Sequence, residues 1–264
     1  MKYIRLYEDF EKYLKPLGKL ERTGDSSYDP YELMLIPPGK KAEMIMKECE
    51  FEHPNVDLIR DLVAMGADLD WYNESLGSPL RSAVVYGKLE VCKILLEAGA
   101  TLDSTLLHIS IFRLNLSISI LKFLLEAGAD PNALNHNEET PLHSAARFTR
   151  NTEVFRMLLE AGADPNVKDG FTLTPLHHAA LVDLRDVIVL FLEYGADINV
   201  QGKNGDTALS FAISDGYYDL VKLLLEKGAD PYIEAKNGMN AFAQAKKESP
   251  KRTIRLLDEY KLPI

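Results

Sequence analysis

The sequence predicts an all-α solenoid, in which about seven pairs of helices stack along one axis. Two strings recur in phase and support this fold class. The first, Leu-Leu-Glu-x-Gly-Ala, occurs four times and once more as Phe-Leu-Glu-Tyr-Gly-Ala. The second, Thr-Pro-Leu-His, lies between these copies at Thr140 and Thr174. With Gly66 added in front, the glycines of the first string are spaced by 33, 29, 34, 33 and 33 residues, which indicates a repeated structural unit.

Each repeated unit encodes two antiparallel helices. Thr before Pro is a good N-cap, and Pro fits the first helical position, so Thr140 and Thr174 each precede the start of a helix. The glycine of the other string suits the left-handed residue that ends a helix. The Asp-Pro-Asn that follows at 130–132 and 164–166 prevents continuation. Between these signals, apolar residues recur at helical spacing.

Both terminal units depart from the repeat, as expected for units that meet water on one side. The first spans about 40–66 and offers helical stretches at 42–50 and 55–65 without the repeat motif. The last runs from Gly238 to Asp258, keeps the spacing and gains surface charge. We interpret them as an N-terminal and a C-terminal cap.

The strings Thr-Pro-Leu-His-x-Ala-Ala at 140–146 and 174–180 resemble the ankyrin repeat. The resemblance implies an ankyrin repeat domain at 40–264, preceded by a non-repeat segment at 1–39. It also implies that each unit carries a β-hairpin tip. In proteins similar to this one, the tips and the first helices of the units line a concave face that binds other proteins.

The third unit departs most from this pattern, because only Ser104 separates Leu102-Asp103 from Thr105. There is no room for a hairpin tip, so a gap in the row of tips is predicted. Two interpretations stay open: a tolerated deletion, or a notch that admits a projecting loop of a partner.

The N-terminal segment, 1–39, begins with a predicted amphipathic helix and is too short for an enzyme domain. It could pack on the first repeat, act as a tether or bind a partner, and all three roles stay open. Its opening, Met1–Phe10, resembles the start of many proteins of large tailed phages. This resemblance implies a phage or bacterial protein that inhibits a protein of the host.

Composition excludes several function classes. A formal net charge of -10 repels phosphate backbones and anionic lipid, so neither nucleic acid nor a membrane is an expected partner. Glu8 and Asp9 stand where a signal peptide needs an apolar core, and no apolar run reaches membrane-spanning length. With only two cysteines, the expected location is the reducing cytoplasm.

Reactive motifs are absent from the sequence, which contains no Walker loop, nucleophile elbow, His-Glu-x-x-His or Cys-x-x-Cys. His108, His143 and His177 recur at one repeat position, with His178 and His136 nearby. Stacked equivalents should lie about 10 Å apart, whereas metal ligands converge within a few ångströms. We therefore expect structural histidines, no metal, no cofactor and no enzyme activity, although a site that escapes motif searches is a rival.

The expected function is non-catalytic binding of a partner protein on the concave face, at positions that stacking leaves free. The alternative is a binder of a small anionic ligand such as a nucleotide signal, using the arginines and rings. A simpler interpretation is that Trp71, Phe148 and Phe171 fold under as local core. The candidate residues are Trp71, Tyr72, Tyr86, Phe112, Arg113, His136, Arg147, Phe148, Phe171 and Leu181.

Overall fold

A computed structural model describes residues 30–74, 77–113, 118–248 and 251–260. The predicted amphipathic helix at the N-terminus lies outside these ranges. The chain divides into two compact units, the first holding residues up to 86 together with 90–101, and the second holding 87–89 and the chain from 102 onward. No helix in the described ranges is both long and apolar enough to span a bilayer.

The first compact unit is built on the predicted N-terminal cap. Helix α3 (Pro38–Glu50) packs against α4 (Val56–Ala64) and α5 (Pro79–Val85), and Asn55 caps α4 by accepting the Leu58 N–H at 3.0 Å. The two cap helices predicted at 42–50 and 55–65 are confirmed, the first beginning four residues earlier. The helices are α2 (Pro30–Leu35), α3 (Pro38–Glu50), α4 (Val56–Ala64), α5 (Pro79–Val85) and α6 (Leu89–Glu97).

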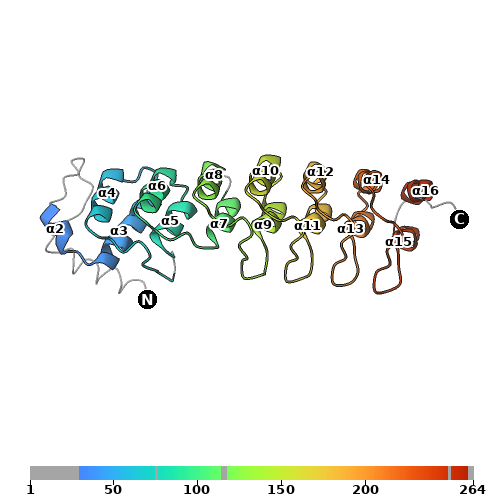
Figure 1. Ribbon diagram of the computed structural model, residues 1–264, viewed down its shortest axis with the longest axis horizontal. Helices are drawn as coiled ribbons and strands as arrows, with labels where there is room; N and C mark the ends of the chain where they lie inside the picture. Colours follow the sequence, from blue (N-terminus) through green and yellow to red (C-terminus); the bar gives the residue numbers. More distant parts are fainter. Residues whose placement is uncertain (1–29, 75–76, 114–117, 249–250, 261–264) are drawn as a thin grey trace. The chain divides into compact units, whose positions relative to one another are not determined.

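In the second compact unit, helix pairs stack side by side in two rows (Figure 1). The inner row contains α7 (Leu106–Phe112), α9 (Pro141–Phe148), α11 (Pro175–Leu181), α13 (Ala208–Ser214) and α15 (Ala241–Glu248). The outer row contains α8 (Ile118–Glu126), α10 (Thr152–Glu160), α12 (Arg185–Glu193), α14 (Tyr218–Glu226) and α16 (Lys251–Glu259). From α3 to α16 the described residues form seven helix pairs, which confirms the predicted all-α solenoid.

Turns after the outer helices are tied to one another by asparagine side chains. The Asn132 carboxamide donates to the Gly162 carbonyl at 3.0 Å and accepts the Asp164 N–H at 2.8 Å. Asn166 repeats both bonds one unit later, to Gly195 and Asp197. We call this series the asparagine ladder.

The predicted hairpin tips are tight turns, and the described ranges contain no β-strand. The fourth tip is closed by the Asn135 N–H donating to the Glu139 carbonyl at 3.0 Å. The fifth joins it through the Gly170 N–H, which donates to the Asn137 carbonyl at 3.1 Å. Thr105 follows directly on 102–104, so the third unit lacks a tip, as its spacing predicts.

Replacing Thr172 in the fifth tip by Gly is expected to raise the free energy of unfolding by about 1 kcal/mol. Thr172 has a φ of 64°, whereas the sixth and seventh tips carry Gly205 and Gly238 at this position. A left-handed β-branched residue costs about 1–3 kcal/mol, partly offset here by the greater freedom of Gly in the unfolded chain. Urea denaturation measures the difference.

The matched control is Gly205→Ala, which places a Cβ 2.8 Å from the Ala235 Cα and should destabilise the fold. A loss of stability in Thr172→Gly would show that the Thr side chain contributes more than its backbone strain costs.

Candidate functional site

Two phenylalanines at the ends of neighbouring inner helices form an exposed aromatic pair. Phe112 ends α7 and Phe148 ends α9, with side chains 60% and 50% exposed. Their rings meet edge to face, with centroids 5.2 Å apart and an interplanar angle of 88°. The sequence-based alternative that Phe148 folds under as core is therefore disfavoured, because half of its surface is open to solvent.

An arginine lies beside each ring of this pair. The guanidinium carbon of Arg113 is 5.9 Å from the Phe112 centroid, and that of Arg147 is 5.6 Å from the Phe148 centroid. These distances permit cation–π attraction. Arg147 also donates to the carboxylate of Glu139, which is 4% exposed, whereas Arg113 has no ion-pair partner within the described ranges.

The tips of the fourth and fifth units add further exposed side chains. Phe171 is 67% exposed and His136 is also exposed, whereas Leu181 on α11 is half-buried. Leu134 at the base of the fourth tip, 50% exposed, was not among the ten candidates. The sequence could have indicated Leu134, because it is a large apolar residue at a tip position. We define the aromatic face as Phe112, Arg113, Arg147, Phe148 and Phe171.

The three candidates in the first compact unit differ in their exposure to solvent. Tyr72 is 67% exposed, and Tyr86 is half-buried at the end of α5. The Trp71 ring lies so close to Gly39 that a Cβ added there would be 2.8 Å from its indole nitrogen. Trp71 is half-buried against Gly39, and the extension of the binding face into this compact unit stays a prediction.

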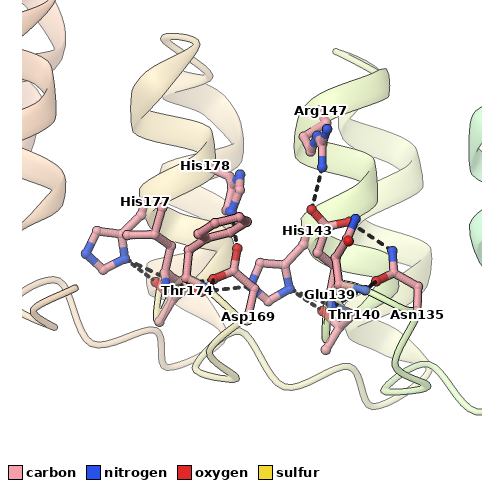
Figure 2. A network of polar contacts seen from close by, with 12 residues as sticks. Asn135, Glu139, Thr140, His143, Arg147, Asp169, Thr174, His177 and His178 are labelled. Carbon is pink, nitrogen blue, oxygen red and sulfur yellow. Dashed lines mark hydrogen bonds and ion pairs between the residues drawn. The ribbon is translucent and has the colours of Figure 1, made fainter. Parts of the chain in front are cut away.

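The histidines bond to adjacent turns (Figure 2). In His143, Nδ1 accepts the Thr140 N–H at 3.1 Å and Nε2 donates to the Leu173 carbonyl of the next unit at 3.0 Å. His177 repeats the pattern with Thr174 and Val200. Burial lowers the pKa of His143 to about 4, so this ring is neutral and both of its nitrogens are used.

Two side-chain pairs anchor the tips to the inner helices (Figure 2). His178 Nε2 lies 2.8 Å from the fully buried Asp169 carboxylate, whose other oxygen accepts the N–H groups of Phe171 and Leu173 at 2.9 Å. Burial alone would raise the pKa of Asp169, but these hydrogen bonds outweigh it and the pKa lies below its usual value. Arg147 and Glu139 form the second pair.

One donor cluster was missed by the sequence reasoning. His143, Asp169 and His178 each place a ligand atom within 4.8 Å of the others, which is compact enough for a metal ion. The spacing argument compared only equivalent histidines, and His178 at the next position reaches back to this site. Each ring nitrogen of His143 already bonds to a backbone group, so a metal would have to displace either the bond to Thr140 or the bond to Leu173, and we interpret the cluster as structural.

Comparison with known proteins identifies the repeat. Family models match residues 162–235 as ankyrin repeats (3 copies), 124–179 as ankyrin repeats (many copies) and 103–136 as an ankyrin repeat. The crystal structure of the ankyrin repeat domain of Bcl-3, a member of the IkappaB family, is 28% identical. The structural alignment covers 85% of this chain and 99% of the Bcl-3 chain, with a TM-score of 0.72.

A curated relative is an ankyrin repeat protein, FPV232, of fowlpox virus (strain NVSL). It is 46% identical over an alignment of 67 residues, and the match covers 23% of this chain and 13% of the poxvirus protein. The repeat strings, the stacked helix pairs and these matches agree with one another. The chain belongs to the ankyrin repeat family.

Proposed function

We propose that this protein binds another protein, without catalysis, through the aromatic face. Ankyrin repeats are in general protein–protein interaction modules, so the general function follows from the family. The observation that carries the specific proposal is the exposed Phe112–Phe148 pair. The stacking of the repeats leaves both rings open to solvent. Aromatic residues and arginines are the commonest anchors of protein interfaces.

The anionic-ligand alternative has less support. It needs the guanidinium groups of Arg113 and Arg147 to be available, but Arg147 is paired with the buried Glu139 carboxylate. Of the two described cavities, one adjoins the third unit and the other lies between the last two tips, and neither is lined by these arginines. A surface of exposed aromatic rings suits a protein partner better than a small molecule, which usually binds in a concave pocket.

Inhibition of a host protein is one form that this binding could take. It is supported by the resemblance of Met1–Phe10 to the openings of phage proteins. Adding the purified chain to an activity assay of the identified partner would test it, and unchanged activity at saturating chain would favour an adaptor or scaffold instead.

The double variant Phe112→Ala/Phe148→Ala is expected to weaken partner binding by at least about 30-fold, because each truncated anchor commonly loses about 1–2 kcal/mol or more. The partner is identified by capture on the immobilised chain and mass spectrometry. Its affinity for each variant is then measured by calorimetry with purified proteins.

The matched control is Lys203→Ala/Asp215→Ala, two exposed positions of the sixth unit outside the aromatic face. Affinity should change little in this variant, and both variants should melt at nearly the wild-type temperature. If the control loses binding and the aromatic variant keeps it, the binding surface lies toward the C-terminus and the proposal is wrong.

A further inference from the structure

The missing tip of the third unit leaves a cavity in the second compact unit. Its volume is about 480 Å³, and it is open to solvent, because Gly128 and Asp130 in its lining are exposed. Asp103 and Asp130 are among its lining residues. The lining residues are Leu102, Asp103, Ser104, Gly128, Ala129, Asp130, Asn132, Ala133 and Leu134.

Two identical nine-residue stretches show what the wall of this cavity can bind. Residues 124–132 and 158–166 both read Leu-Leu-Glu-Ala-Gly-Ala-Asp-Pro-Asn. Their glycines have φ angles of 90° and 95°, so the two turns have the same backbone form. In the second stretch, the Gly162 carbonyl and the Asp164 N–H together hold the Asn132 carboxamide. The first stretch offers the same acceptor and donor.

In the first stretch this acceptor and donor have no protein partner among the described residues. Asp103 occupies the ladder position, four residues after Gly99, as Asn132 is four residues after Gly128. Its Oδ1 instead accepts the N–H and the hydroxyl of Thr105, because the start of α7 follows immediately where the tip is missing. The asparagine ladder is therefore interrupted at the cavity.

We propose that the cavity is the docking site for a loop of the partner protein that presents an asparagine side chain. The carboxamide would accept the Asp130 N–H and donate to the Gly128 carbonyl, as Asn132 does one unit later. A carboxylate side chain lacks the donor, and a lysine side chain lacks the acceptor. The proposal rests on the protein-binding function proposed above and adds the chemistry of the bound loop.

A cyclic peptide that copies residues 130–141 of this chain is the probe for the first test. Added to the isotope-labelled full chain, it should shift the Asp130 amide resonance, saturating at about 1 mM or below, and leave Asp164 unmoved. The same peptide with Ala in place of the residue that copies Asn132 should bind at least about tenfold more weakly. An unmoved Asp130 amide, or equal binding of both peptides, would overturn the proposal.

The second test fills the cavity. Six residues that copy 134–139 are inserted between Ser104 and Thr105, together with Asp103→Asn, to restore a tip and its ladder residue. The filled variant should melt at or above the wild-type temperature and lose both the probe peptide and the captured partner. The control carries the same six residues after Asn237 in the last tip and should bind as wild type.

The two proposals fail in different ways. If the filled variant keeps the partner while Phe112→Ala/Phe148→Ala loses it, the docking proposal is wrong and the aromatic face stands. If the filled variant loses the partner and the aromatic variant keeps it, the cavity is the site and the aromatic face is not. If both variants keep the partner, both proposals are wrong.

Discussion

A chain that stops after Gly228 is expected to aggregate or to lose its cooperative unfolding transition. The deleted part contains α15 and α16, which pack against α13 and α14. Leu256 and Leu257 on α16 are 4% and 0% exposed. Burying each such side chain stabilises by about 1.5–3 kcal/mol, so their loss with the rest of the cap is large beside a total stability of about 5–15 kcal/mol.

The cap is suited to its end position because one side of α16 is charged and the other is apolar. Arg255 and Asp258 are exposed, while Thr253 is buried with the leucines. Arg252 lies over the Tyr218 ring of α14 at 4.6 Å. Removing α15 and α16 exposes the apolar faces of α13 and α14, which these two helices cover.

Light scattering and circular dichroism during thermal unfolding measure the effect of this truncation. A chain ending at Tyr260 is the control and should behave as the full chain does. A soluble Gly228 truncation with a cooperative transition would show that the sixth unit can serve as the end of the stack, and that the last unit has another role.

The starts of the inner helices could be predicted because their signals are local. Ser78, Thr140, Thr174 and Thr207 all precede the first turn of a helix in the structure, in each case in an extended backbone conformation. The chemistry of an N-cap lies within three residues of the cap, so a single sequence contains it. The same holds for the glycines that end the outer helices, such as Gly128 and Gly162.

The contacts of the candidate site could not be predicted in the same way. The Arg147–Glu139 pair joins a helix to its own tip, and His143 bonds a carbonyl 30 residues away. These contacts depend on how each tip turns and on the rise from one repeat to the next. Exposure at Phe112 and Phe148 was predicted from repeat position alone, but the packing of Trp71 on Gly39 depends on how the cap folds.

The asparagine ladder could be predicted from the sequence only in part. Asn recurs four residues after three of the glycines, at Asn132, Asn166 and Asn199. The first two belong to the string Asp-Pro-Asn, which was interpreted only as a stop signal. Its side chains in fact bridge consecutive turns, as Asn132 does between Gly162 and Asp164. Periodicity identifies such a position, whereas the partner of its side chain requires the stacked structure.

The free energy of unfolding is expected to fall as the pH falls from about 6.5 to about 4. Burial lowers the pKa of His143 to about 4 and also lowers the pKa values of His108 and His177. In the unfolded chain a histidine has a pKa of about 6.5, so over this interval the unfolded state binds protons that the folded state does not. The stabilisation is fully present above pH 6.5 and is lost on acidification, by about 3 kcal/mol for His143 alone.

The variant His143→Gln separates this effect from general acid unfolding, because Gln does not titrate. At pH 7 it should be less stable than wild type by about 1–3 kcal/mol, since the bonds to Thr140 and Leu173 are disturbed. Between pH 6.5 and 4 its stability should depend less steeply on pH, by about one bound proton, so the two curves converge. Urea denaturation at a series of pH values measures both, and His136→Gln at an exposed tip position is the control. If the gap between His143→Gln and wild type stays constant down to pH 4, the buried ring is not the source of the acid sensitivity.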